Sequence, residues 1–472
     1  MLFSSMVFIY FFLPIVLFVY YALLRNKRSL QNLFLTLASL LFYAWGGVRF
    51  TAIMLLSVFI NWALALLVSH FKDSQKALAK GGLVLACVAN LTILFVFKYL
   101  VFSVNTINEF FDLTMTVPQI TLPIGISFFT FQAMSYVIDV YRGKGKAQKN
   151  ILDVALYISL FPQLIAGPIV RYETIAEEIE NRTVDFDEIL DGLSRFIIGL
   201  AKKVLIANKL ALFADSCFSS VETLSVASSW LGAISYTFQI FFDFSGYSDM
   251  AIGLGRMFGF HFLENFNYPY ISKSITEFWR RWHISLGTWF RDYVYIPLGG
   301  SRVNRMLLVR NLFVVWLLTG IWHGANWTFV VWGLMYFILL TIEKFTGFAN
   351  KDNTGSWRGL HWAYTMFFVV IGWVIFRADS LSTALSYIQT MLGINNHILI
   401  DEVFFKELGS SGLVLAAATV FSLPIGKRIQ EKMNVNQSWI QILYNVIIVV
   451  LFISSVFSIV TSAYNPFIYF NF

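Results

Sequence analysis

Charged residues are scarce in this sequence. Only 13% of its 472 residues are Asp, Glu, Lys or Arg, whereas a soluble domain carries about 25%. Hydrophobic residues make up 58%, and the mean hydropathy is +0.69. The apolar residues occur in long runs, not in the short alternating segments that a membrane β-barrel would show. The sequence therefore predicts an all-α protein that crosses the membrane several times.

Cysteine and long basic blocks are also lacking. Cys87 and Cys217 lie far apart, which excludes a disulfide framework and leaves no spacing typical of a metal site. We therefore expect no metal. The net charge is +7, but no basic block is long enough for DNA or RNA binding, so we place this charge on the cytoplasmic side of a bilayer.

No common nucleotide-binding or hydrolase motif is present. Gly253, Gly255 and Gly259 have the spacing G-x-G-x-x-x-G, without the βαβ context of a dinucleotide site. The HExxH, Walker A and nucleophile-elbow patterns are absent from the sequence. Metalloprotease, P-loop and α/β-hydrolase chemistry are therefore excluded.

The apolar runs predict about 11 transmembrane helices in one multi-pass domain, 1–472, with no internal repeat. Segments 119–141 and 151–170 hold Pro, Gly and polar residues, so we expect broken or re-entrant pieces there. The basic, aromatic segment 264–310 favours helices lying in the cytoplasmic interface. The expected spans are 2–24, 30–47, 51–69, 81–101, 192–215, about two hydrophobic lengths within 225–260, 307–323, 324–346, 360–378, 411–425 and 438–463.

Basic residues follow the first apolar run and do not precede it. Arg25, Lys27 and Arg28 come after residues 2–24, which argues against a cleaved signal. By the positive-inside rule, this order predicts a cytoplasmic first connection and an N-terminus outside the cell.

His323 is the most informative single residue, because an ionisable side chain at bilayer depth is costly. It lies within the apolar, aromatic run 316–332. Histidine can act as a general base near neutral pH, since its unperturbed pKa is about 6.5. The alternative is a packing histidine with a satisfied hydrogen bond. On a continuous helix, the residues sharing its face are Trp316, Thr319, Gly320, Asn326 and Trp327.

A second histidine, His283, stands in a basic, Trp-rich segment. There Arg280 and Arg281 are suited to phosphate groups, and Trp279 and Trp282 to stacking on a base. The alternative is a cytoplasmic anchor made of basic and Trp residues. Two polar residues in an apolar run, Gln239 and Asp243, are further candidates. The carboxylate needs a partner at this depth, for which we expect Arg or His from a neighbouring segment; a structural ion pair is the alternative to a functional site.

Taken together, these residues resemble the membrane-bound O-acyltransferase superfamily, and within it the bacterial branch that O-acetylates alginate and other polysaccharides (AlgI-like). The resemblance covers nearly the whole chain. Its motifs are Ser127–Gln132 (SFFTFQ), Pro162–Pro168 (PQLIAGP), Gln239–Asp249 (QIFFDFSGYSD), Asn265–Tyr270 (NFNYPY), Glu277–His283 (EFWRRWH), Trp289–Gly300 (WFRDYVYIPLGG), Thr319–Trp327 (TGIWHGANW) and Asn465–Phe472 (NPFIYFNF).

The resemblance implies helices around a central funnel or tunnel, in a bacterial inner (plasma) membrane. It also implies acetyl transfer from a cytoplasmic thioester, acetyl-CoA, toward a polysaccharide hydroxyl. The near-invariant histidine of the family matches His323, and its second motif residue, His or Asn, matches His283. Since thioester chemistry needs a base and oxyanion donors, we expect His323 to be the base. We expect His283, with Asn326 or Trp322, to orient the thioester or stabilise charge.

We also expect basic residues that attract the donor, and a separate partner protein. Lys273, with Arg280 and Arg281, would steer a phosphate-bearing donor. The branch usually works with a separate extracytoplasmic SGNH-type transferase or esterase, so we expect such a partner besides the polysaccharide and the bilayer. The alternatives are D-alanine transfer to teichoic acid, a transporter or flippase of a polymer precursor, and a non-catalytic scaffold.

Overall fold

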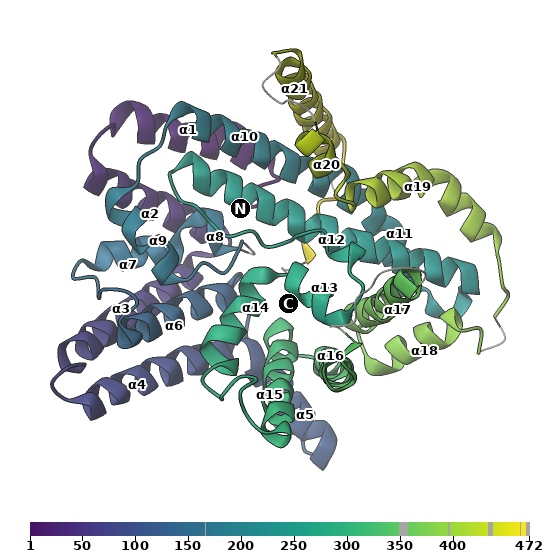
Figure 1. The fold of residues 1–472 in the computed structure, drawn as a ribbon, viewed down its shortest axis with the longest axis horizontal. Coiled ribbons are helices and arrows are strands. Elements are labelled where there is room, and N and C mark those ends of the chain that lie inside the picture. The colour runs from purple at the N-terminus through teal and green to yellow at the C-terminus, as the bar shows by residue number, and fades with distance from the viewer. Residues whose placement is uncertain (166, 349–356, 395–396, 433–437, 463, 469–472) are drawn as a thin grey trace. The chain divides into compact units, whose positions relative to one another are not determined.

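The computed structural model describes residues 1–165, 167–348, 357–394, 397–432, 438–462 and 464–468 (Figure 1). These residues form helices joined by loops, and none of them is in a β-strand. The described chain packs as two compact units, one of residues 1–196 and 247–263, the other of residues 197–246 and 264–472. The expectation of an all-helical membrane protein is confirmed. The expectations of a single domain and of a central funnel stay predictions.

The first unit holds the N-terminal helices, several of them π-helical at their ends. Its elements are η1 (Phe8–Phe12), α1 (Leu13–Phe18), η2 (Val19–Leu23), α2 (Arg28–Ala44), α3 (Val48–Phe71), α4 (Lys76–Leu94), η3 (Phe95–Tyr99), α5 (Leu100–Phe111), α6 (Ile126–Arg142), α7 (Ile151–Ser159), α8 (Phe161–Leu164), α9 (Tyr172–Asn181) and most of α10 (Phe186–Ala201).

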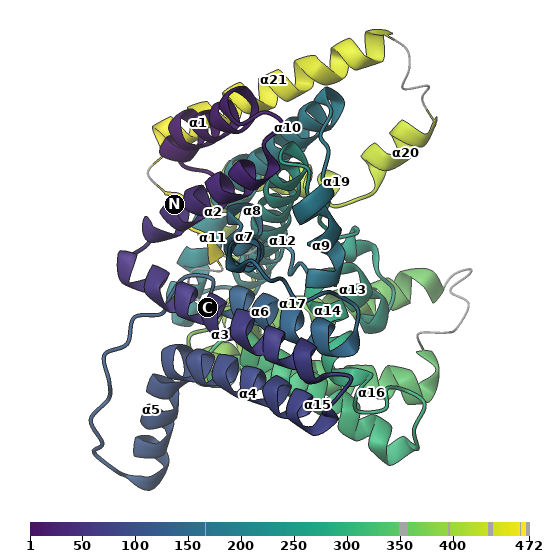
Figure 2. The ribbon, with the colours of Figure 1, turned by 90° about the vertical axis from the view of Figure 1, so that its left-hand side faces the viewer.

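Aromatic packing and buried amides hold the first unit together. The rings of Phe8, Phe12 and Phe161 lie 5.3–6.2 Å apart by centroids. Helices α3 and α4 run side by side in both views (Figures 1 and 2). Between them, Asn61 and Asn90 exchange amide hydrogen bonds of 2.8 and 3.1 Å. Such pairs stabilise helix contacts in lipid, where apolar surface alone gives no preference for a protein neighbour.

The second unit holds the C-terminal half of the chain. Its elements after α10 are η4 (Lys202–Ala207), α11 (Asn208–Ser219), η5 (Val221–Thr223), the part of α12 (Val226–Met257) up to residue 246, η6 (Pro269–Ile271), α13 (Ile275–Arg281), α14 (Ile284–Phe290), η7 (Arg291–Tyr295), α15 (Arg305–His323), α16 (Trp327–Thr346), α17 (Trp357–Arg377), α18 (Leu381–Met391), α19 (Glu402–Phe421), α20 (Ile425–Lys432) and α21 (Ser438–Thr461).

Two glycines let α15 and α16 approach closely. A Cβ atom on Gly320 would lie 2.5 Å from the carbonyl oxygen of Phe329, and one on Gly333 would lie 2.5 Å from that of Trp316. Both contacts are with backbone, which cannot move aside as a flexible side chain could. Small residues therefore allow the close spacing between these two helices, as is common for helices in a bilayer.

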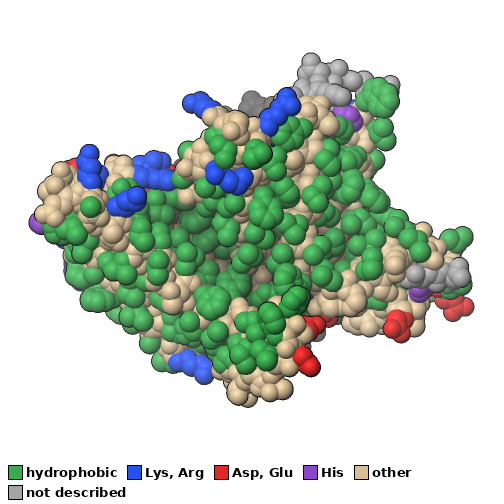
Figure 3. Space-filling view, turned by 90° about the horizontal axis from the view of Figure 1, so that it is seen from below, with side chains coloured by type: hydrophobic (Ala, Val, Ile, Leu, Met, Phe, Trp, Pro, Cys, Tyr) green, Lys and Arg blue, Asp and Glu red, His purple; other side chains and the backbone are tan. Residues whose placement is uncertain are grey.

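Among the described residues, seven helices are long and apolar enough to cross a membrane. They correspond to the expected spans 51–69, 81–101, 307–323, 324–346, 360–378, 411–425 and 438–463. Leucine, isoleucine, valine and phenylalanine side chains remain exposed on these helices, and hydrophobic side chains cover most of the face drawn in Figure 3. Such a surface suits contact with lipid.

Segment 225–260 differs from its expectation of two hydrophobic lengths, because α12 is one continuous helix of 32 residues. Its glycines do not interrupt it; they allow close packing against α10. A Cβ on Gly246 would meet the carbonyl oxygen of Gly199 in the second unit. A Cβ on Gly253 would meet that of Gly192 in the first unit.

The expected break in 151–170 is present. Helix α7 ends at Ser159, and α8, with Pro162 in its first turn, has only four residues. Side chains bind the backbone groups that the break sets free: Phe161 N donates to Ser39 Oγ at 3.0 Å, and Tyr157 Oη donates to Val170 O at 2.9 Å. Irregular backbone of this kind is tolerated when it is buried within protein.

Candidate active site

His323 is the last residue of α15, and the chain turns sharply after it. Gly324 is extended, and Asn326 begins α16 as its N-cap, accepting a 3.0 Å hydrogen bond from Thr328 N. Asn326 and Trp327 therefore belong to the next helix and do not share the helical face of His323 that a continuous helix would give them. A short polar residue at an N-cap satisfies backbone donors, which explains why the helix starts there.

Aromatic rings surround His323 in the second unit. Its own ring centroid lies 5.1 Å from that of Trp322, 5.0 Å from that of Trp332 and 5.2 Å from that of Phe376. Only 3% of the residue is exposed. Three helices, α15, α16 and α17, thus surround one imidazole with packed aromatic side chains, and we call this set of side chains the chamber. Electrostatic interactions are stronger in such surroundings than in water.

His283 joins α13 to α14 in a left-handed backbone conformation, φ +46°, which is uncommon for a residue other than glycine. It is 1% exposed, and its ring packs edge-on against Phe244 at 4.7 Å between centroids. Its Nδ1 lies 3.1 Å from Asn265 Oδ1, while Nε2 has no hydrogen-bond partner among the described residues. Burial lowers the pKa of His283 to about 3, so the imidazole is neutral at physiological pH.

The two histidines lie in one site. Their ring centroids are 6.5 Å apart, and Trp322 lies beside both, 5.9 Å from His283 and 5.1 Å from His323. This separation is too long for a direct hydrogen bond between the rings, and short enough for a small reacting group to contact both. The structure therefore brings together residues that are 40 positions apart in the sequence.

The predicted donor-binding residues lie on and around α13. Arg280 is exposed, whereas Arg281 forms an ion pair with Glu277 at 2.9 Å. Lys273 N donates to Glu277 Oε2 at 2.9 Å. The Trp279 ring is half-buried and contacts the rings of Trp316, Trp332 and Tyr336. Arg280 thus has the guanidinium open to a ligand, and the donor-binding role of the whole set stays a prediction.

Trp282 is buried more deeply than a stacking platform at a surface would be. Its ring is 1% exposed and packs 4.8 Å from Trp373 and 5.6 Å from Phe278, centroid to centroid. It therefore supports the chamber from within. Its role toward a donor base stays a prediction.

Asp243 and Gln239 lie on α12, and the carboxylate of Asp243 already has partners within the protein. Its carboxylate forms a 2.7 Å ion pair with Lys203, and its Oδ2 accepts a 2.9 Å hydrogen bond from Ile468 N. The Arg or His partner expected for Asp243 was wrong, because Lys203 of η4 reaches this carboxylate within the second unit. The other carboxylate of the run, Asp249, does pair with an arginine, Arg195, at 2.9 Å. Gln239 is buried, with Oε1 unpaired among the described residues. Residues 469–472 of the C-terminal motif lie outside the described residues.

Two polar residues near the site were not singled out from the sequence. Asn265 is the first residue of the motif Asn265–Tyr270, but nothing in that motif connects it with His283, which lies 18 residues further along the chain. Glu343 is 1% exposed and accepts hydrogen bonds from Ile275 N and Thr276 N at 2.7 and 2.8 Å, which fixes the start of α13. An acidic residue inside an apolar span was the available signal for Glu343.

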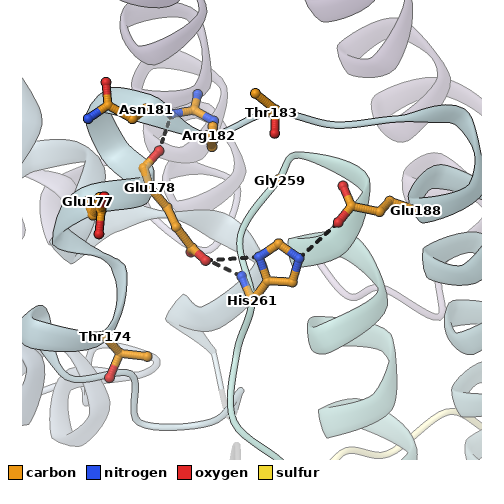
Figure 4. A pocket seen from close by; sticks show the side chains of 9 residues that line it. All are labelled: Thr174, Glu177, Glu178, Asn181, Arg182, Thr183, Glu188, Gly259 and His261. Carbon is orange, nitrogen blue, oxygen red and sulfur yellow. Dashed lines mark hydrogen bonds and ion pairs between the residues drawn. The ribbon is translucent and has the colours of Figure 1, made fainter.

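The first unit contains a separate cavity of about 320 Å³, lined by acidic residues and His261 (Figure 4). His261 lies between Glu178 and Glu188, at 2.9 and 3.1 Å. Partial burial lowers its pKa, but the hydrogen bonds to both carboxylates outweigh this and raise the pKa above its ordinary value. No residue predicted as a site residue lines this cavity. It is therefore distinct from the histidine site.

Comparisons with known proteins assign the family. Residues 3–382 match the model of the membrane-bound O-acyltransferase family. The chain is 42% identical to a probable alginate O-acetylase AlgI of Pseudomonas putida, over 100% of both chains. It is 37% identical to a peptidoglycan O-acetyltransferase of Helicobacter pylori, over 84% of this chain and 80% of the relative.

A more distant relative is a teichoic acid D-alanyltransferase of Bacillus subtilis, 30% identical over 54% of this chain and 68% of the relative. The family match spans both histidines and the short helices between them. With its hydrophobic helices and its buried pair of imidazoles, the chain belongs to the membrane-bound O-acyltransferase family.

Proposed function

We propose that this protein takes an acetyl group from cytoplasmic acetyl-CoA and passes it across the membrane for O-acetylation of a cell-surface polysaccharide. The observation that carries this proposal is the pair of buried imidazoles, 6.5 Å apart, in one chamber of an O-acyltransferase. The names of the relatives from P. putida and H. pylori support acetyl as the group and a polysaccharide as the acceptor.

His323 is the proposed general base. It takes the proton of the acceptor hydroxyl as that oxygen attacks the thioester carbonyl carbon. The carbon–sulfur bond then breaks, and the proton passes to the leaving thiolate, which gives an acetyl ester and free CoA thiol. His283, held neutral by burial, offers Nε2 as a hydrogen-bond acceptor beside the reacting groups. N–H donors near the chamber, of which Trp322 is the candidate, stabilise the oxyanion.

The donor approaches from the cytoplasmic side of α13. The exposed guanidinium of Arg280 meets its phosphates, aided by Lys273 and Arg281, and Trp279 offers a ring edge or face to the base. A separate extracytoplasmic SGNH-type protein completes delivery to the polymer; the support for this partner is the sequence resemblance.

A transfer assay tests the proposal. It contains the purified protein, its partner, a polysaccharide acceptor and acetyl-CoA that carries a label in its acetyl group. We expect label to appear on the polysaccharide acceptor in step with release of free CoA thiol. Transfer only from a D-alanyl carrier protein would assign the teichoic-acid reaction instead. Movement of a polymer precursor across vesicles without any acyl transfer would assign transport, and both outcomes would overturn the proposal.

The proposed location is the bacterial inner (plasma) membrane, with the N-terminus outside. Its support is the basic group at 25–28 that follows the first apolar run. In a variant lacking Cys87 and Cys217, we expect Lys27→Cys to react with a membrane-impermeant maleimide only after cells are permeabilised. Labelling of intact cells would contradict this orientation.

A further inference from the structure

The hydrogen bonds from Ser285 show which way the side-chain amide of Asn265 points. Its Oδ1 accepts a hydrogen bond from the backbone N–H of Ser285 at 3.2 Å. A backbone N–H can only donate, so the atom facing it must be the amide oxygen and not the amide nitrogen. Ser285 Oγ donates to the same oxygen at 2.9 Å. The amide of Asn265, which is 1% exposed, therefore turns its oxygen toward His283.

The orientation of this oxygen decides which nitrogen of His283 carries the proton. Nδ1 of His283 lies 3.1 Å from Asn265 Oδ1, which can only accept. In a neutral imidazole one nitrogen donates and the other accepts. Nδ1 must therefore be the protonated nitrogen, and Nε2, which has no partner among the described residues, carries the lone pair.

Backbone contacts hold the same geometry from a second direction. Asn265 O accepts from Ile284 N at 3.0 Å, and Asn267 N donates to Arg281 O at 2.9 Å. Segment 265–267 thus pairs with both sides of His283 and supports its left-handed conformation, φ +46°. Strain of this kind persists only where surrounding contacts over-determine it.

We propose that Asn265 is a positioning residue for acyl transfer, which holds the His283 proton on Nδ1 and leaves Nε2 as the hydrogen-bond acceptor of the site. This rests on the proposed function, because it assigns a purpose to Nε2 in the transfer. The described ring contacts of His283 are with Phe244, Trp322 and His323, so His323 is the titratable neighbour of the ring.

Steady-state kinetics of Asn265→Ala and Asn265→Asp test the proposal. Loss of the orienting acceptor in Asn265→Ala is expected to lower kcat about 10- to 100-fold, by analogy with the size seen when partners that orient a metal-bound histidine are removed. KM for acetyl-CoA should change little, since this amide is 1% exposed and its oxygen is bound by protein groups. Aspartate keeps an oxygen in the same place, so Asn265→Asp should retain more of kcat than Asn265→Ala.

The pH profile separates positioning from a structural role. The carboxylate of Asn265→Asp favours the imidazolium form of His283 and raises its pKa. In the wild type the acid limb of kcat reports the base His323, because the pKa of His283 is about 3. In Asn265→Asp the raised pKa of His283 brings a second protonation into the acid range, so the acid limb should become steeper than in the wild type. A variant with only a packing defect would lose activity evenly across pH, which would overturn the proposal.

Asn311→Ala is the matched control. Asn311 is a fully buried asparagine of the same unit, and its amide donates to Leu298 O and Gly300 O at 3.2 and 3.0 Å. Activities are compared per folded protein, with folding followed by thermal unfolding in detergent. If Asn311→Ala lowered kcat as much as Asn265→Ala, the effect would belong to any lost buried amide, and the proposal would fall.

Nitrogen NMR of histidine-labelled protein, with His283→Gln to assign the signal, reads the tautomer without any activity. We expect Nδ1–H with unprotonated Nε2 in the wild type, and a loss of that preference in Asn265→Ala. A wild-type Nε2–H tautomer would overturn the proposal. If the wild type showed no acetyl transfer while the expected tautomer was present, the proposed function would fail and the inference with it, although the geometry would stand.

Discussion

Replacing His323 with glutamine is expected to lower acetyl transfer roughly 10²- to 10⁴-fold, the contribution of a positioned general base. Glutamine keeps much of the volume that fills the ring contacts with Trp332 and Phe376, but it cannot take a proton at neutral pH. The loss should therefore appear in kcat, with donor affinity largely kept. Release of CoA thiol from acetyl-CoA, with the partner and acceptor present, measures it.

His323→Ala is expected to be equally inactive and also less stable, because it leaves a cavity among aromatic rings. His70→Ala is the matched control, since His70 is an exposed residue in the last turn of α3. It should retain wild-type activity. Turnover by folded His323→Gln close to that of the wild type would exclude His323 as the base, while unchanged surface acetylation in cells would favour a scaffold.

Replacing Lys203 with methionine is expected to destabilise the fold by about 3–5 kcal/mol, the cost of leaving a buried charge without its partner. Lys203 is 1% exposed and Asp243 is 2% exposed, with 2.7 Å between them. The Lys203 ammonium also donates to Asn208 Oδ1 at 2.8 Å and to Pro466 O. The Asp243 carboxylate accepts a hydrogen bond from Ile468 N. The loss should free the C-terminal residues 464–468 as well.

Thermal unfolding in detergent, followed by tryptophan fluorescence, measures this effect. The double variant Lys203→Met/Asp243→Asn removes both charges and keeps an acceptor for Ile468 N, so it should recover much of the lost stability. The control is Arg291→Met, since Arg291 pairs with Asp292 at the surface with 57% of its side chain exposed. Exposed pairs are worth about 0–1 kcal/mol. Equal stability of Lys203→Met and the double variant would show that the buried charge carries no penalty.

The buried pair illustrates what could be anticipated from the sequence. A carboxylate at position 243 of an apolar run must find a partner, and hydropathy alone reveals this need. The partner itself depends on how η4 packs against α12, which no local pattern encodes. The expectation of Arg or His was therefore wrong for Asp243, although this carboxylate does have a cationic partner, as the alternative of a structural ion pair requires.

The end of α15 at His323 shows the same limit of local patterns for residues that are close in the sequence. Helical spacing puts Asn326 on the face of His323 only if one helix continues through both residues. An extended Gly324 and the N-cap formed by Asn326 end one helix and start the next. Glycine and asparagine between two apolar runs are signals of such a break, and residues on its two sides do not share a helical face.

The sequence by itself determined the membrane class, the approximate positions of the seven long spans, the family resemblance and the choice of His323 and His283. These features rest on composition, hydropathy and short motifs, which are local and therefore readable along the chain. Tertiary structure decided that the two imidazoles lie 6.5 Å apart, that Asn265 orients one of them, and that Lys203 neutralises Asp243. Each of these contacts joins residues 18 to 40 positions apart, and packing between helices, not local sequence, sets such distances.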